Sequence, residues 1–133
     1  MTESALYPKL QLLATQLGAR LFRNNVAQGV VGKIERITEE RVYRLYPGDC
    51  IVRNARVLHA GLATGSADLI GWTPTIVQGE SVAVFTSVEV KPERGGRITQ
   101  DQLAWRNTVN DAGGLAMIVR SEREYEDAVR AAL

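Results

Sequence analysis

The segment Ser81–Lys91 constrains the fold more than any other part of this chain. Alternate side chains of an extended strand point to opposite faces of its sheet. One face of this segment carries valines, and the other carries mostly small or apolar residues before it ends in Glu89 and Lys91. A strand that is apolar on one face and nearly so on the other belongs inside a sheet. The sequence therefore predicts a sheet with residues 81–91 in its interior.

A hairpin partner precedes this strand. Residues 68–77 form a second strand candidate, and Gln78-Gly79-Glu80 is typical of the turn that joins two such strands. Pro74 has no backbone N–H to donate to a neighbouring strand. The later part of the 68–77 strand is therefore expected to bend or to lie at a sheet edge.

Helices are expected at three places around these strands. A capping box, in which Thr or Ser is followed three residues later by Gln or Glu, opens at 99–102 and again at 121–124. These boxes predict helices to about residues 112 and 132, with a strand at 115–120 between them. An amphipathic helix over residues 3–19 is predicted by leucines at three- and four-residue steps: Leu6, Leu10, Leu13 and Leu17.

The region between residues 20 and 67 contains shorter candidate elements. We expect strands over residues 20–25, 30–37 and 41–46, the last two joined by Thr38-Glu39-Glu40, and short extended segments at Cys50–Val52 and Arg56–His59. Turns or loops are predicted at 47–49 and 61–66. Together the elements predict a single α/β domain over residues 1–133.

Composition narrows the class of protein. The chain has 133 residues, of which 45% are hydrophobic and 23% charged, as in ordinary soluble domains. No apolar run reaches the ~20 residues that cross a bilayer, and the start of the chain lacks the pattern of a signal peptide. Cys50 is the only cysteine, which excludes an intrachain disulfide. We therefore expect a cytoplasmic protein without membrane association.

Asp68, Glu89 and Lys91 form the constellation with the clearest chemistry. Glu89 and Lys91 are two residues apart on one strand and so project from the same face, and the hairpin brings Asp68 alongside Glu89. Two carboxylates and the Val90 carbonyl make an oxygen-rich site suited to Mg²⁺ or Mn²⁺, and a lysine beside them can stabilise charge on a phosphate. The alternative is an exposed cross-strand ion pair, with Asp68 as a turn residue.

The order of several short motifs resembles the VRR-NUC family, small nucleases of the PD-(D/E)XK superfamily found as standalone domains in phages and bacteria. The residues that carry the resemblance are 65–71 (GSADLIG), 88–91 (VEVK), Thr99-x-x-Gln102-x-x-Trp105 and 113–121 (GGLAMIVRS). The resemblance implies a restriction-endonuclease-like mixed central sheet flanked by helices. Ala67 stands where the superfamily expects proline, at a position that shapes the turn and supplies no ligand.

The resemblance also implies roles for individual residues. Asp68, Glu89 and the Val90 carbonyl would bind Mg²⁺ or Mn²⁺, Lys91 would be the catalytic lysine, and Gln102 would approach the active site, although its capping box alone also accounts for it. Glu3 is a candidate for a further acidic ligand from the first helix. Residues that would contact DNA are Arg23, Asn24, Arg94 and Arg97.

The implied function is a metal-dependent DNA endonuclease that hydrolyses phosphodiester bonds. Standalone members of the family act as homodimers on branched DNA such as four-way junctions, so we expect a homodimer selective for such structures, in the cytoplasm of a bacterial host if the chain is phage-encoded. The alternative is a non-catalytic module that binds nucleic acid or protein on the same fold.

Overall fold

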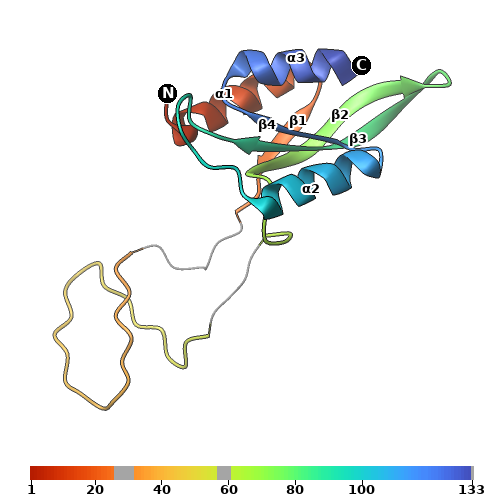
Figure 1. Cartoon of the computed structure of the whole chain (residues 1–133). Helices are drawn as coiled ribbons and strands as arrows, with labels where there is room; N and C mark the ends of the chain where they lie inside the picture. Colours follow the sequence, from red (N-terminus) through yellow and green to blue (C-terminus); the bar gives the residue numbers. More distant parts are fainter. Residues whose placement is uncertain (26–31, 57–60, 133) are drawn as a thin grey trace.

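The computed structural model describes residues 1–25, 32–56 and 61–132. Its elements are α1 (Glu3–Gln16), β1 (Arg20–Arg23), β2 (Leu69–Val77), β3 (Glu80–Val90), α2 (Gln100–Asp111), β4 (Leu115–Val119) and α3 (Glu122–Ala132). One mixed sheet has the strand order β1-β2-β3-β4, antiparallel except for the parallel pair β3/β4. Helices α1 and α3 cover one face of the sheet and α2 lies on the other (Figure 1). The predicted α/β fold, with a mixed sheet flanked by helices, is confirmed.

The core lies between the sheet and the α1/α3 layer. Leu6 and Leu10 of α1 are at most 2% exposed, and they join Leu69 and Val88 of the sheet in one apolar cluster. The leucine stripe predicted for the first helix therefore faces the core. Burial of such side chains stabilises the fold by roughly 1.5–3 kcal/mol each, and it fixes α1 beside the end of the sheet where β2 begins.

The β2/β3 hairpin is buried only in the half near the helices. Gln78 and Gly79 at its tip have φ of 51° and 82°, as a two-residue turn between right-twisted strands requires. Strand β1 pairs only with residues 69–72 of β2, and β4 pairs with β3 only from Thr86 onward. The predicted interior strand is therefore buried at residues 86–90 but exposed or half-buried over 80–85. Pro74 lies beyond the end of β1, at the edge expected for it.

The strands predicted between β1 and β2 are wrong where the structure describes them. Residues 32–37, 41–46 and 50–52 form no strand, while residues 30–31 and 57–59 lie outside the described residues. These segments contain β-branched and aromatic residues that favour strands, but β1 and β2 pair directly with each other, and the intervening chain projects away from the sheet (Figure 1). The predicted turn is present, with the Asp49 N–H bonded to the Tyr46 carbonyl at 2.9 Å.

Tyr125 of α3 provides a test of the core. Its ring is 0% exposed, and its hydroxyl has no hydrogen-bond partner among the described residues. We expect Tyr125→Phe to raise the free energy of unfolding by about 1 kcal/mol at pH 8, because it removes a desolvated polar group. Urea denaturation measures the change, and the exposed Tyr46→Phe, which should have no effect, is the control.

The pH dependence of the same variant gives a second readout. Burial raises the pKa of Tyr125 to about 12, whereas an unfolded tyrosine has a pKa of about 10. Deprotonation of the unfolded chain therefore removes stability as the pH rises from about 10 to 12, by up to about 1.4 kcal/mol per pH unit. The advantage of Tyr125→Phe over the wild type should grow between pH 8 and pH 11, and an unchanged difference would contradict this account.

Candidate active site

Asp68 and Glu89 meet where β2 begins and β3 ends. The antiparallel register pairs Leu69 with Val88, which brings Asp68 alongside the last residues of β3. Because β2 starts only at Leu69, the Val90 N–H has no ladder partner there and donates instead to Asp68 Oδ2 at 2.9 Å. The N–H and C=O of one strand residue point to the same side. The Val90 carbonyl is therefore directed toward the side of Asp68, as the oxygen-rich site requires.

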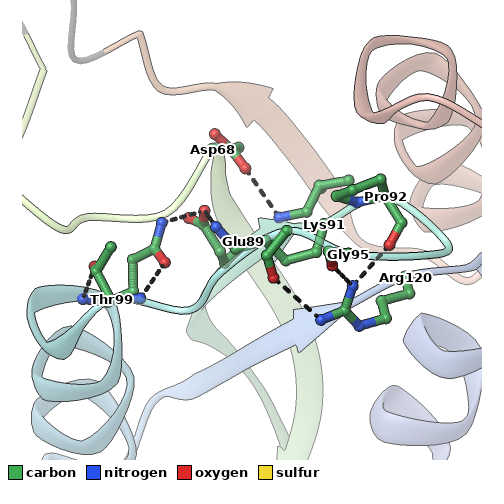
Figure 2. Close-up of polar contacts among 10 residues, drawn as sticks. Asp68, Glu89, Lys91, Pro92, Gly95, Thr99 and Arg120 are labelled. Carbon is green, nitrogen blue, oxygen red and sulfur yellow. Dashed lines mark hydrogen bonds and ion pairs between the residues drawn. The ribbon is translucent and has the colours of Figure 1, made fainter.

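Glu89 and Lys91 project from the face of β3 that α2 covers, and they are only 7% and 8% exposed. Lys91 Nζ lies 3.4 Å from Glu89 Oε1, and Figure 2 shows both side chains beside Asp68. Burial, followed by repulsion from Asp68, raises the pKa of Glu89 to about 7, although the Lys91 ammonium lowers it. One lysine thus only partly neutralises the two carboxylates.

Gln102 uses the two ends of its side-chain amide for different purposes. Its Oε1 accepts a hydrogen bond from the Thr99 N–H at 3.0 Å and completes the predicted capping box. Its Nε2 donates to Glu89 Oε1 at 2.6 Å. From the sequence, Gln102 could either cap the helix or approach the active site. In the structure it makes both contacts. The start of α2 therefore holds the Glu89 carboxylate in position.

The first turn of α1 also faces this region. Glu3 is half-buried, and its charge contributes to the raised pKa of Glu89. Tyr7 lies one turn further along the helix, and the Arg23 guanidinium sits 3.6 Å from its ring centroid. Burial raises the pKa of Tyr7, and Asp68 adds to this effect. Tyr7 was not among the residues predicted at the site, although its four-residue step from Glu3 could have indicated it.

Asn24 connects β1 to the Asp68 segment. Its N–H donates to the Asp68 carbonyl at 2.8 Å, and its Nδ2 donates to the Ala67 carbonyl at 2.9 Å and to Ser66 Oγ at 3.0 Å. The backbone and side-chain amides of Asn24 are thus engaged with other residues of the protein. Asn24 therefore positions Asp68, whereas the DNA contact expected for it stays a prediction.

A substitution tests this positioning role. We expect Asn24→Ala to lower the free energy of unfolding by about 1–2 kcal/mol through two lost hydrogen bonds. Nuclease turnover should fall about tenfold or more, because a displaced Asp68 carboxylate no longer meets the reacting groups. Thermal denaturation and a cleavage assay measure the two effects. The neighbouring Asn25→Ala is the control, and equal activity of both variants would contradict the role.

Arg120 holds the loop that follows Lys91. It lies directly after β4, and its guanidinium donates to the carbonyls of Pro92 at 2.8 Å, of Gly96 at 3.4 Å and of Gly95 (Figure 2). The loop displays Arg94 and Arg97 on the surface. Arg120 lies in the motif 113–121, but no role was predicted for it, although the parallel pairing of β3 and β4 places the ends of these strands together.

Trp105 belongs to the packing between α2 and the sheet. Its Nε1 donates to Ser87 Oγ at 3.1 Å, and its ring meets that of Phe85 edge-on at 6.5 Å. Both contacts are on β3, the strand that carries Glu89. The indole therefore helps to fix α2, and with it Gln102, over the site.

The donor set is restricted to two carboxylates and one carbonyl. Over residues 1–25, 32–56 and 61–132, no group of three or more His, Cys, Asp or Glu side chains could hold a metal ion. Two carboxylates with a main-chain oxygen nevertheless match the hard oxygen ligands that Mg²⁺ and Mn²⁺ prefer, with water filling the other positions. Burial and then repulsion from Asp68 raise the pKa of Glu89, and a cation between the carboxylates would offset both effects. The residues present fit such an ion.

Fold and site together define a class of protein. A mixed sheet flanked by helices, with two acidic residues and a lysine at the ends of adjacent strands, is the arrangement of a restriction-endonuclease-like nuclease. The VRR-NUC domain model matches residues 14–123. The chain therefore belongs to the VRR-NUC family, and its activity is of the nuclease type. A search of curated proteins and a search of solved structures found no similar chain.

The match covers most of the candidate site. Asp68, Glu89, Lys91 and Gln102 all lie within residues 14–123, whereas Glu3 lies outside.

Within the part of the chain that the structure describes, no helix is long and apolar enough to cross a membrane.

Proposed function

We propose that this chain is an endonuclease that depends on Mg²⁺ or Mn²⁺ and hydrolyses phosphodiester bonds of DNA. The observation that carries the proposal is the convergence of Asp68 and Glu89 from adjacent strand ends, with Lys91 Nζ 3.4 Å from Glu89. A structural ion pair on a sheet surface would be solvated, whereas Glu89 and Lys91 are both more than nine-tenths buried.

Asp68, Glu89 and the Val90 carbonyl would hold the ion. Glu3 faces the same region from α1 and is a further candidate ligand. The bound ion would supply positive charge for the phosphate and lower the pKa of a coordinated water. This donor set explains why two carboxylates are placed close together despite their repulsion.

Lys91 and Gln102 would complete the site in different ways. The Glu89 carboxylate keeps the Lys91 ammonium at the site, where it would stabilise charge that develops on the phosphate oxygens. Gln102 donates to Glu89, so it would act by orienting that carboxylate. Arg23 beside Tyr7, together with Arg94 and Arg97 in the loop after Lys91, would contact the DNA backbone.

We further propose that the substrate is branched DNA and that the protein works as a homodimer. The family resemblance is the basis for both. Two active sites related by a two-fold axis would match the symmetry of a four-way junction. A single small domain offers little surface for gripping a duplex, and a second copy would extend it.

One assay tests the proposed function. The purified protein is incubated with linear duplex, flapped and four-way DNA, in Mg²⁺, in Mn²⁺ or in EDTA. We expect cleavage with either ion, none in EDTA, and the fastest reaction on branched DNA. A folded protein that cuts none of these substrates would instead be a non-catalytic binding module.

Substitutions at the start of α2 separate helix capping from catalysis. Gln102→Glu keeps the oxygen that accepts from the Thr99 N–H but loses the donor to Glu89, so we expect cleavage at pH 8 to fall at least about tenfold. Thr99→Ala loses a capping oxygen and leaves the contact between Gln102 and Glu89, so it should cost about 1 kcal/mol of stability with activity kept. Matching activities in the two variants would show that Gln102 serves only as a cap.

A further inference from the structure

A long excursion leaves the sheet between β1 and β2. Its described part, residues 32–56, is called the arm here; Figure 1 shows it projecting away from the sheet and helices. The chain around it is held together beside the candidate active site, because the Asn24 N–H donates to the Asp68 carbonyl at 2.8 Å. The chain that carries the arm therefore leaves and rejoins the fold at Asn24 and Asp68, next to the carboxylate that is proposed to bind metal.

The arm contains a short tandem motif. Arg-aliphatic-Tyr occurs twice in succession, at 41–43 and at 44–46, and all six residues are exposed. The Arg41 guanidinium lies 5.6 Å from the Tyr43 ring centroid, and that of Arg44 lies 5.9 Å from the Tyr46 ring. The rings are 49% and 61% exposed. Each tyrosine thus already carries a cation beside it.

The charges around this motif favour an anionic ligand. From residue 41 to residue 56 the arm carries four arginines, at 41, 44, 53 and 56, and one acid, Asp49. The preceding residues are mixed: the Tyr43 hydroxyl bonds to the Glu35 carboxylate, which also lies 4.0 Å from Lys33. The Glu35 carboxylate thus lies at the hydroxyl end of Tyr43, whereas the excess of positive charge comes from the four arginines of residues 41–56.

We infer that the arm binds unpaired nucleotides of the DNA substrate. Tyr43 and Tyr46 stack on bases, and Arg41 and Arg44 pair with the phosphates. Exposed aromatic rings combined with arginines form the surface that single strands use, because every base has a flat face. Bases inside a duplex stack on one another and do not offer these faces. The inference deepens the proposed function and rests on it, since it specifies which part of a branched substrate the protein holds.

A protein partner or a second copy of the chain is the competing occupant. The arm also exposes aliphatic side chains, namely Ile34, Ile37, Val42, Leu45, Ile51 and Val52. The exposed aliphatic side chains would suit an apolar partner and give no reason for an anion. The repeated arginines would suit an anion and give no reason for an apolar partner. The arginine-tyrosine pairs favour a nucleic acid, and the experiment separates the two occupants.

The test measures binding without cleavage. The full-length protein in EDTA is titrated against a fluorescein-labelled 20-nucleotide oligo-dT and against a 20-base-pair duplex, and anisotropy gives Kd at several NaCl concentrations. We expect Tyr43→Ala/Tyr46→Ala to weaken oligo-dT binding about 30-fold, from the loss of two stacked bases, with little change for the duplex. Tyr43→Phe/Tyr46→Phe keeps both rings and should bind within about twofold of the wild type.

The arginines have a different expected signature. Arg41→Ala/Arg44→Ala should reduce the slope of log Kd against log salt by about 1.4, which corresponds to two phosphate contacts on a single strand. The tyrosine variants should leave this slope unchanged. Arg123→Ala/Arg130→Ala, which removes two exposed arginines from α3, is the control of matched charge and should change neither quantity.

Three results would overturn the inference. The first is oligo-dT binding by the tyrosine-to-alanine variant that equals the wild type, and the second is an equal loss for duplex and oligo-dT. The third is a tyrosine-to-alanine variant that sediments as a monomer where the wild type is a dimer, with an unchanged Kd for oligo-dT. This result would show that the arm binds a second copy of the chain. A cleavage assay run in parallel distinguishes the two proposals. If the protein cleaves DNA but the arm variants bind oligo-dT as the wild type does, only the inference about the arm is overturned. If the protein does not cleave DNA but binds oligo-dT through the tyrosines, only the nuclease proposal is overturned.

Discussion

Asp68→Asn is expected to lower the rate of DNA cleavage on the order of a thousandfold. The asparagine keeps an oxygen that can accept from the Val90 N–H, so the connection between β2 and β3 is preserved while one carboxylate charge is lost. The proposed metal would then have a single acidic side chain from the strands, Glu89. Single-turnover cleavage of a four-way junction in Mg²⁺ measures the rate, and calorimetric titration with Mn²⁺ should show a matching loss of binding.

Asp101→Asn is the matched control for this experiment. Asp101 is an exposed acid in the first turn of α2, so the variant makes the same chemical change close to the site without entering it. Its cleavage rate should stay within about threefold of the wild type, since an exposed charge at a helix start contributes little. An Asp68→Asn protein that cuts as fast as Asp101→Asn would remove the basis of the metal-dependent mechanism.

Gly71→Ala is expected to have the largest effect on stability, a loss of at least about 4 kcal/mol in the free energy of unfolding. Strands β1 and β2 approach so closely that a Cβ at this position would lie 1.8 Å from the Arg20 carbonyl oxygen. That oxygen belongs to the backbone of a paired strand, so it cannot move without breaking the pairing of Leu21 with Gly71. Thermal denaturation followed by far-UV circular dichroism measures the loss.

Gly79→Ala is the control for the glycine substitution. Gly79 lies at the tip of the hairpin with φ of 82° and nothing within 4 Å of the added Cβ, so the variant should cost only about 1–2 kcal/mol in backbone strain. A similar loss in both variants would show that the close approach of the Arg20 carbonyl does not have the effect expected at Gly71.

The second half of the fold could be predicted from local signals in the sequence. The turn at Gln78-Gly79, the capping box at Thr99 and the period-two alternation of residues 81–91 each act within a few residues, and each appears in the structure. The segment between β1 and β2 shows the limit of such signals. Residues 41–46 contain residue types that favour strands, Val42 and two tyrosines, but a strand also needs a partner with free backbone groups, which local sequence does not supply.

The candidate site shows the same division between local and distant information. Asp68 lies beside Glu89 and Lys91 because of the hairpin register, so the sequence was sufficient to predict that these residues come together. Tyr7 and Arg120 come from other elements, and their places depend on how α1 and β4 pack against the sheet. Side chains that support a site from a separate element are the ones that a single sequence reveals least.

Because of the backbone hydrogen bond between Asn24 and Asp68, we expect that the arm can be replaced without disturbing the rest of the fold. Because the two ends of the excursion are joined by a backbone hydrogen bond and by the Asn24 amide, residues can be added or removed between positions 33 and 56 without shifting the Asp68 carboxylate. Each doubling of loop length costs only about 0.6 kcal/mol in closure entropy. We therefore expect that grafting a different arm would change the reach of the proposed DNA-binding surface, while the position of the Asp68 carboxylate is kept.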